Sequence, residues 1–360
     1  MWMERLAHWL HARLLFLLVG AYIAAAFLPG LGLALRGVNF GKLAGALPMN
    51  PPTLMLSFLL FNAGLGVRAA ALKNWHESAE TLAVGTLANL VVPAAFVALA
   101  SQALRLWHNP DETQNILTGL ALVASMPIAG SSTAWSQNAD GDLAVSLGLV
   151  LVSTALSPLT TPILLHAGAA VTTGDYAEDL GKLAGQGTSL FLIVFVLAPS
   201  LAGILVRWIL GERRARTVQP SLKVANTLVL LMLVYSNAAV TLPQTIARPD
   251  TDFIILVLAV ATLLCFTAFI SGWALARLLH LHKPQEAALV FGLGMSNNGT
   301  GLVVATGALP EHPLVLLPIL SYNLVQHLVA GIMDYLLFRE SPRWRTLFLA
   351  HSRRRPRKAA

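Results

Sequence analysis

Ten stretches of this chain are apolar over a length that can cross a lipid bilayer, and no other feature limits the fold so strongly. The hydrocarbon core of a bilayer requires about 20 residues of helix. Only 11% of the 360 residues are charged, whereas a soluble domain carries about 25%. We therefore predict an all-α integral membrane protein with ten transmembrane helices and no separate soluble domain. The predicted spans are residues 14–34, 51–71, 80–103, 114–138, 143–167, 186–210, 222–246, 253–279, 287–308 and 313–337.

The positions of Lys and Arg predict the orientation of these spans, because cytoplasmic loops of membrane proteins are enriched in both residues. With both termini in the cytoplasm, all but five of the 24 Lys and Arg residues fall on the inner side. We predict a multi-pass protein of the cell (inner) membrane, with a ten-helix domain over residues 1–340 and a basic cytoplasmic tail over residues 341–360. The tail faces anionic lipid headgroups, and no nucleic-acid partner is expected. The five outer cations are Arg36, Lys42, Arg105, Lys182 and Arg248.

Residues typical of several enzyme classes are absent or lie outside the spans. Cys265 is the single cysteine, which excludes a disulfide framework and a cysteine-based metal site. Asp140 and Asp142 resemble a protease aspartate pair only superficially, because both lie in a loop between spans. The sequence contains neither an HExxH pair nor a GxSxG elbow. We predict that the protein is not an enzyme and holds no cofactor.

Two of the predicted spans contain residues that interrupt a helix. Span 4 reads MPIAGSST over residues 126–133, and span 9 reads GMSNNGTG over residues 294–301. Proline removes a backbone donor and clashes with the preceding turn, and glycine is a poor helix former. In a membrane, broken backbone survives only inside protein or beside a watery cavity. We predict that spans 4 and 9 are discontinuous and cross each other, around residues 127–133 and 293–300.

The two interrupted spans are the fourth and the ninth of ten, which indicates an internal repeat. Asn62, in the triplet FNA of span 2, is echoed by Asn237, in the triplet SNA of span 7. Because each repeat has an odd number of spans, the second repeat enters the membrane upside down relative to the first. We predict two inverted five-helix repeats, over about residues 14–167 and 186–337.

Polar residues of the interruptions and of the facing spans form the predicted substrate site. Carbonyl oxygens released at a broken helix bind cations, and new helix N-termini attract anions. The competing interpretation is that Gly and Ser only permit close helix packing. In span 10, Asn323, Gln326 and His327 share one helical face. Three roles are open for this face: it lines the substrate cavity, it relays a proton through His327, or it packs in the core. The predicted substrate-binding residues are Asn62, Gly130, Ser131, Asn237, Asn297, Asn298, Asn323 and His327.

Four motifs of the chain resemble motifs of the bile acid:sodium symporter family. Residues 61–67 (FNAGLGV) are similar to its FGMGL-type motif, and residues 126–146 to its PGGTASN stretch with the following GD-x-A-L-S. Residues 294–301 are similar to its GMQN-x-G-x-G crossing, and residues 321–331 to its WHN-type motif. The resemblance implies a panel domain (spans 1, 2, 6 and 7) and a core domain (spans 3–5 and 8–10). It also implies alternating access for an organic anion, driven by two sodium ions.

The sodium ligands that the resemblance implies are only partly kept. The family's bridging glutamate is Gly292 here, and a sodium-ligand threonine is Val150. Without a carboxylate, two closely spaced cations would repel each other strongly inside a membrane. We therefore predict at most one sodium site, of weak affinity. The ligands implied for it are Asn89, Ser132, Thr133, Ser146, Met295 and Ser296.

These observations together predict a secondary active transporter of a small organic anion in the lipid bilayer, with Na⁺ as the candidate coupling ion. Two alternatives share the fold, namely a proton-coupled or uncoupled carrier and a non-transporting membrane sensor. An arsenite-type exporter is a further variant, but span 4 lacks the cysteine that such an exporter is expected to carry.

Overall fold

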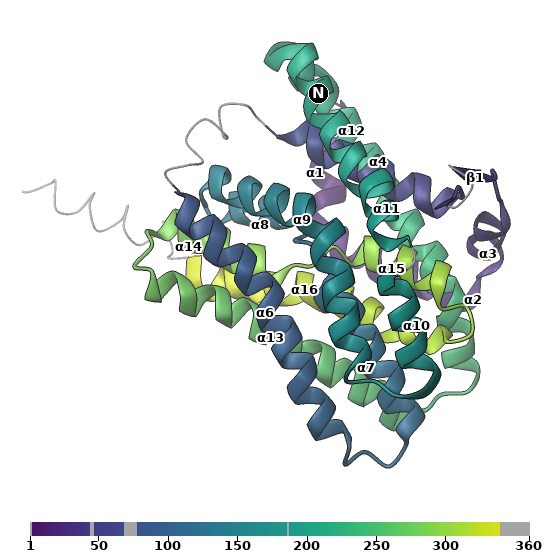
Figure 1. Ribbon diagram of the computed structural model, residues 1–360. Coiled ribbons are helices and arrows are strands. Elements are labelled where there is room, and N and C mark those ends of the chain that lie inside the picture. The colour runs from purple at the N-terminus through teal and green to yellow at the C-terminus, as the bar shows by residue number, and fades with distance from the viewer. Residues whose placement is uncertain (1, 44–46, 68–77, 186, 339–360) are drawn as a thin grey trace, which may run out of the picture.

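The structure is a computed structural model in which helices make up almost all of the chain (Figure 1). It describes residues 2–43, 47–67, 78–185 and 187–338. The predicted basic tail, residues 341–360, lies outside the described residues, as does the end of the second predicted span, residues 68–71. The predicted all-helical class is confirmed.

The helices and the two short strands follow the chain in this order. Up to residue 169 they are α1 (Trp2–Ala12), α2 (Leu14–Phe27), α3 (Gly30–Gly37), β1 (Lys42–Leu43), β2 (Leu47–Pro48), α4 (Pro51–Gly66), α6 (Ala79–Leu104), α7 (Pro110–Ser125), α8 (Ser132–Asn138) and α9 (Leu143–Ala169). From residue 174 they are α10 (Gly174–Gly185), α11 (Thr188–Leu192), the π-helix η2 (Ile193–Leu197), α12 (Ala198–Ala247), α13 (Thr251–Leu278), α14 (Lys283–Gly294), α15 (Asn298–Ala308), the 3₁₀-helix η3 (Pro313–Val315), α16 (Leu316–Met333) and the π-helix η4 (Asp334–Phe338). The strands β1 and β2 pair antiparallel, with Leu43 opposite Leu47.

Six helices among the described residues are long and apolar enough to cross a membrane, or seven if the bent pair α2–α3 is one span. This supports a multi-pass membrane protein, whereas the number ten and the inverted repeats stay predictions. The two counts differ mainly where a predicted span is not one long helix. Spans 4 and 9 are each divided into two shorter helices, and α4 is described over only 16 residues.

The first predicted span, residues 14–34, is not one continuous helix but a bent pair of helices, α2 and α3. Helices α2 and α3 meet at an angle of 85°. The bend falls at Leu28 and Pro29, where proline withdraws one backbone donor. The carbonyl oxygen of Leu28 accepts a hydrogen bond from the hydroxyl of Tyr235 on α12. The bend is therefore held by a residue more than 200 positions away in the sequence.

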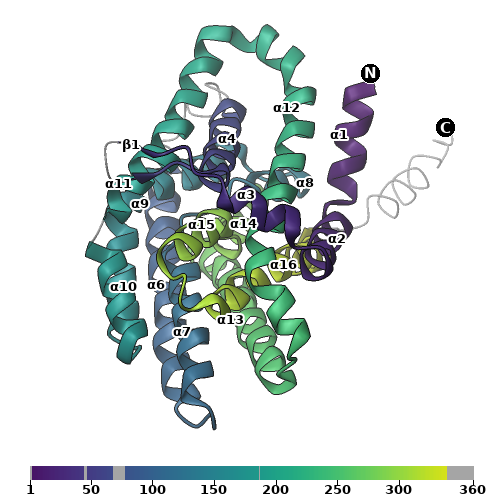
Figure 2. The ribbon, with the colours of Figure 1, turned by 90° about the vertical axis from the view of Figure 1, so that its right-hand side faces the viewer.

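Two further departures from the predicted layout concern connections. Gly211 has a φ of 70° inside α12, a conformation that glycine adopts without steric cost. At this kink α12 turns over in an arch, which joins the two apolar segments Thr188–Gly211 and Thr217–Ala247 (Figure 2). The predicted loop between spans 5 and 6 contains the helix α10, whose Tyr176, Leu180 and Leu183 are buried.

The helices pack in two groups. Helix α12 lies against α2, α3 and α4, while α13 lies against α14 and α16, and α6 against α7 and α9. The largest cluster of buried apolar side chains lies mainly in the second group, with Phe269, Phe291 and Tyr322, and extends to Ala25 of α2 and Ala238 of α12. The resemblance to a panel and a core domain predicts the same division of the helices.

Two glycines allow α4 and α12 to approach closely. A Cβ atom at Gly64 would overlap the carbonyl oxygen of Ser200, and a Cβ atom at Gly203 would overlap the carbonyl oxygen of Phe61. Small residues permit such close backbone contact between membrane helices. The glycine of the FNAGLG motif at position 64 is therefore required by packing.

We predict that Gly64→Ala destabilises the protein by about 1–3 kcal/mol, because the added methyl group has to push two helix backbones apart. Gly66→Ala is the matched control, since nothing lies within 4 Å of a Cβ atom at this position of the same helix. The thermal midpoint of the purified protein in detergent measures the effect. Equal midpoints for the two variants would show that the α4–α12 contact is not tight.

Candidate functional site

The two interrupted helices meet at their breaks. Helix α7 ends at Ser125 and α8 begins at Ser132, while α14 ends at Gly294 and α15 begins at Asn298. Between these ends the two extended segments pair antiparallel, with Ile128 opposite Ser296. The N–H of Ala129 donates to the carbonyl oxygen of Met295 over 2.8 Å, and the N–H of Asn297 donates to the carbonyl oxygen of Pro127 over 2.9 Å. The predicted interruption and crossing of spans 4 and 9 are confirmed.

Four side chains bind the backbone groups that the breaks leave without helical partners. Thr161 donates to the carbonyl oxygen of Ser125 over 2.6 Å, and Tyr322 donates to that of Gly294 over 3.2 Å. Ser153 accepts from the N–H of Ile128, and Gln326 accepts from the N–H of Ser296, each over 3.1 Å. An unpaired backbone group in hydrocarbon costs several kcal/mol. These side chains therefore offset most of the free-energy cost of broken backbone in a membrane.

The sequence analysis did not assign a role to Ser153, Thr161 or Tyr322. The sequence feature that could have identified them is a polar side chain within an otherwise apolar span. Nothing in the local sequence showed which distant backbone group each one would reach, because the partners lie 25 to 36 residues away.

Near their starts, the two half-helices carry buried polar atoms that have no hydrogen-bond partner among the described residues. On α8 these are the hydroxyl oxygens of Ser132 and Ser136, and on α15 they are both amide atoms of Asn298 and the hydroxyl of Thr300. All four residues are at most 1% exposed. An unsatisfied buried donor or acceptor costs about 1–3 kcal/mol. Such atoms at both sides of the crossing are therefore candidates for binding a ligand or an ion.

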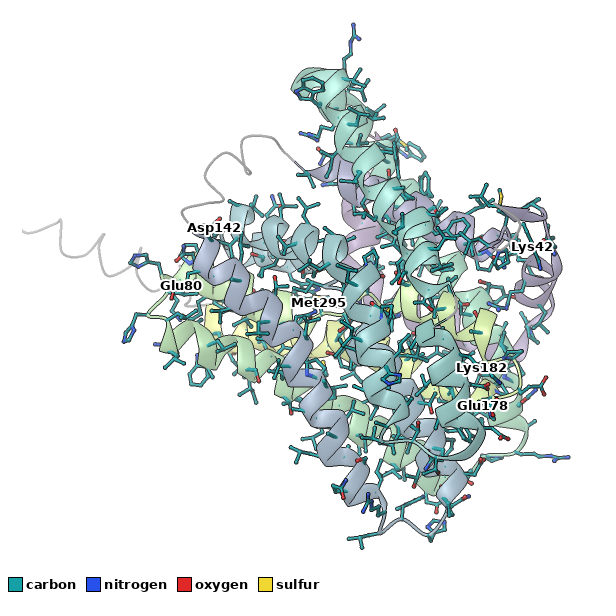
Figure 3. All side chains as sticks on the ribbon, viewed as in Figure 1. Lys42, Glu80, Asp142, Glu178, Lys182 and Met295 are labelled. Carbon is teal, nitrogen blue, oxygen red and sulfur yellow. The ribbon has the colours of Figure 1, made fainter. Side chains whose placement is uncertain are left out.

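The six candidate sodium ligands fall into two sets. Ser132, Ser146 and Asn89, from α8, α9 and α6, are buried, and each has a side-chain polar atom without a partner. In the other set, the hydroxyl of Thr133 donates to the carbonyl oxygen of Gly130 over 2.7 Å. The remaining two ligands, Met295 and Ser296, lie in the crossing itself, where their backbone groups take part in its hydrogen bonds. Figure 3 places Met295 among the helices, far from the exposed Lys42.

An apolar side chain lies next to Gly292, the position at which the resemblance implies a carboxylate. A Cβ atom at Gly292 would lie 3.0 Å from a methyl group of Leu149, which is fully buried. Among the described residues, no group of three or more His, Cys, Asp or Glu side chains is placed to hold a metal ion. Any cation at the crossing would thus be bound by neutral oxygens.

A cavity of about 210 Å³ lies beside the crossing, between α4 and α12 on one side and α9 on the other. Three predicted residues line it, namely Asn62, Gly130 and Thr133, and both amide atoms of Asn62 are buried without a partner. The complete lining is Leu60, Asn62, Ala63, Gly64, Gly66, Val67, Ile128, Gly130, Thr133, Leu147, Val150, Leu151, Thr154 and Ser200.

Asn237, Asn297, Asn298, Asn323 and His327 do not line this cavity. Asn237 is fully buried and accepts a hydrogen bond from Arg36 over 2.7 Å. Asn297 caps α15, its side chain accepting from the N–H of Thr300. Ser131, half-buried, lies at the start of α8 and is also outside the lining. We had expected Asn62, Asn237, Asn297 and His327 to share one cavity, and the structure brings only Asn62 to this one.

The polar face of α16 forms a chain of hydrogen bonds toward the crossing. Asn323 donates to the hydroxyl of Tyr22 on α2 over 3.1 Å, and Gln326 donates to Asn323 over 3.3 Å. Gln326 in turn accepts from the backbone of Ser296. His327 accepts from the indole N–H of Trp135 on α8 over 3.4 Å. The chain of hydrogen bonds ties α2 and α16 to the crossing, and the role of this face stays a prediction.

The two aspartates between spans 4 and 5 have structural positions. Asp142 caps α9 by accepting from the N–H groups of Ala144 and Val145, and Figure 3 shows it at the edge of the molecule. Asp140 lies in the preceding turn with a φ of 54°. Both aspartates lie in the connection between α8 and α9, where the sequence predicts a loop.

This chain is similar to one protein family and to two bacterial proteins among known sequences. The model of the sodium bile acid symporter family matches residues 53–248. The uncharacterized protein YbaS of Bacillus subtilis is 27% identical over 225 residues, which cover 62% of this chain and 69% of YbaS. YocS of the same organism, described as an uncharacterized sodium-dependent transporter, is 25% identical over 284 residues, covering 78% of this chain and 80% of YocS.

We predict that Thr161→Val destabilises the protein by about 1–3 kcal/mol, because it leaves the terminal carbonyl of α7 buried and unpaired. Thr160→Val is the matched control, since this hydroxyl donates only within its own helix, to Leu156. Chemical or thermal unfolding in detergent measures both variants. A Thr161 variant as stable as the Thr160 variant would mean that another group satisfies the break.

Proposed function

Because this chain belongs to the sodium bile acid symporter family, we propose that it is a secondary transporter that carries a small organic anion across the cell membrane by alternating access. The observation that carries the proposal is the cavity between the two groups of helices, directly beside the crossing. Movement of one group against the other would open that cavity to one side of the membrane at a time, as in transporters with broken helices at the binding site.

The chemistry of the cavity fits the charged part of such a substrate. The amide of Asn62 has a donor and an acceptor without partners, and Thr133 lies on the facing wall. No carboxylate belongs to the lining, so a bound anion meets no like charge. A neutral amide binds without titrating, so substrate binding would not depend on pH through this residue.

A second hollow supports a substrate with an apolar part. A groove of about 440 Å³ runs between α9 and the start of α12, and it shares Leu151, Thr154 and Ser200 with the cavity. Its other lining residues are Gly148, Val152, Ala155, Leu197, Leu201 and Ile204. We propose that the anionic group lies near Asn62 and that the hydrocarbon part extends along this groove.

For coupling, we propose at most one sodium ion per transport cycle. Ser132, Ser146 and Asn89 provide neutral candidate ligands, but position 292, where the resemblance implies a carboxylate, is a glycine that lies beside Leu149. Two cations held by neutral oxygens alone would repel each other across a low-dielectric interior. The same observation favours an uncoupled carrier as the second candidate function.

We predict that sodium-jump uptake in proteoliposomes depends on Na⁺ with a Hill coefficient near one, or shows no dependence at all in the uncoupled case. A coefficient near two would contradict the single site. If the ion binds, Ser146→Ala should abolish its stabilising effect while leaving the sodium-free protein equally or more stable, because an unpaired hydroxyl is removed. Ser157→Ala is the control, since this buried hydroxyl in α9 already donates to Thr154. It should keep the response to Na⁺.

We also predict that cysteine at position 62 reacts with a membrane-impermeant thiol reagent faster than cysteine at position 237. Asn62 lines the cavity, whereas Asn237 is fully buried under Arg36. The native Cys265 is buried and provides an unreactive background. Labelling is followed by mass spectrometry, with and without transported substrate, which should protect position 62. Equal or reversed rates would place the access route elsewhere.

A further inference from the structure

Arg36 is a half-buried cation without an anionic partner among the described residues. It lies in the last turn of α3, and its guanidinium donates to the side-chain oxygen of Asn237 over 2.7 Å. The ion pairs of the described residues involve other cations, and no further interaction of Arg36 is present. Buried or partly buried charges are normally paired. A guanidinium has five N–H donors, so most of its binding capacity is unused here.

The fold fixes the position of α3, the helix that carries Arg36. Gly32, one turn before Arg36, lets α3 touch α12, because a Cβ atom there would lie 2.8 Å from the Cβ of Ala239. Helix α3 packs against α12 and α4, and Figure 2 shows α3 beside α12. Tyr235 holds the bend that starts α3 by donating to Leu28. The cation is therefore positioned by packing and does not reach its place on a flexible loop.

Asn237 is oriented to receive Arg36. Its amide nitrogen donates to the carbonyl oxygen of Leu233 over 2.9 Å, which turns its oxygen toward α3. Thr306 on α15 approaches the same oxygen at 3.4 Å. A neutral carboxamide partner anchors one N–H group of the guanidinium and leaves its positive charge uncompensated. A carboxylate at position 237 would have neutralised that charge.

We infer that Arg36, anchored by Asn237, is a second anion-binding site, one that takes a carboxylate or a similar oxyanion. Arginine binds such planar oxyanions with two parallel hydrogen bonds. The bound anion would supply the missing counter-charge and use donors that the protein leaves unpaired.

This site is separate from the cavity around Asn62. The apolar cluster of Leu56, Leu60, Leu233 and Val303 joins the two regions. Leu60 lines the cavity, whereas Leu233 accepts the hydrogen bond from Asn237. The distribution of Lys and Arg places Arg36 on the outer side. The following assignment rests on the proposed function. The Arg36 site is the first that an incoming anion meets, and the apolar cluster lies between this site and the cavity.

The alternative role of Arg36 is structural, since a cation near a helix C-terminus is favourable by itself. Asn237→Asp separates the two roles. It keeps the shape of the side chain and places a carboxylate on the guanidinium, so the contact with Arg36 would be preserved or strengthened, while the hydrogen bond from position 237 to Leu233 is lost. If Arg36 binds an anion, by contrast, the new carboxylate would occupy the guanidinium, and the external anion could no longer bind.

The test measures binding by thermal shift of the full-length protein in detergent, with acetate, succinate, citrate and cholate as probes at matched ionic strength. We expect at least one of these carboxylates to stabilise the native protein. Arg36→Gln should weaken its apparent affinity on the order of 10- to 100-fold, and Arg36→Lys less. Asn237→Asp should abolish the stabilisation by the probe, measured as the shift relative to the ligand-free variant, because that variant also loses the hydrogen bond to Leu233. Arg248→Gln, which removes another outer cation at an exposed position, should bind like the native protein.

The inference is overturned if no probe stabilises the native protein, or if Asn237→Asp binds as the native protein does. Equal binding by Arg36→Gln would place the anion elsewhere. Uptake of the same probe into proteoliposomes is measured independently. If binding depends on Arg36 but no uptake is seen, the proposed transport is rejected and this site is kept. If uptake is seen and does not depend on Arg36, the proposed transport is kept and this site is rejected.

Discussion

Two backbone hydrogen bonds, between Ala129 and Met295 and between Asn297 and Pro127, hold the centre of this protein together. In an apolar interior each broken helix would expose donors and acceptors at a cost of several kcal/mol per group. Here each break supplies part of what the other lacks, and side chains from α9 and α16 supply the rest. The two breaks are therefore interdependent. Neither half-helix can shift at the crossing without uncovering polar backbone on the other, so this region is expected to move as one body.

The same constraint explains why the neighbourhood of the crossing is rich in neutral polar atoms and poor in charge. Hydroxyls and amides satisfy backbone groups without the desolvation penalty that an ionised side chain would pay. The atoms left over, on Ser132, Ser146 and Asn298, remain available to a ligand or an ion. Leu149 packs against Gly292 in place of a counter-charge. In the proposed transport cycle, sodium coupling would be limited by the lack of negative charge near Gly292 and not by a shortage of oxygen ligands.

The two regions proposed to bind an anion differ in how they are built. The cavity near Asn62 is formed between groups of helices that touch through an apolar cluster, and its polar groups are neutral. The Arg36 region is held inside one contact, between α3 and α12, and its charge is uncompensated. A charged outer region attracts an anion over a longer range than a neutral one. A neutral inner cavity releases the anion more easily, since no strong ion pair has to be broken.

Local chemistry was enough to predict part of this protein. The long apolar spans, and the places where Pro127 and the glycine-rich segment at 294–301 break a helix, follow from backbone geometry and from the lack of water in a bilayer. The bend at Leu28, the contact of Arg36 with Asn237, and the partners of Asn323 and Gln326 did not follow from the sequence. Each of them depends on a residue far along the chain, or on which of several compatible hydrogen bonds the packing selects. Only the tertiary structure decides between such partners, because a polar side chain in a span shows that it needs a partner but not which one it will meet.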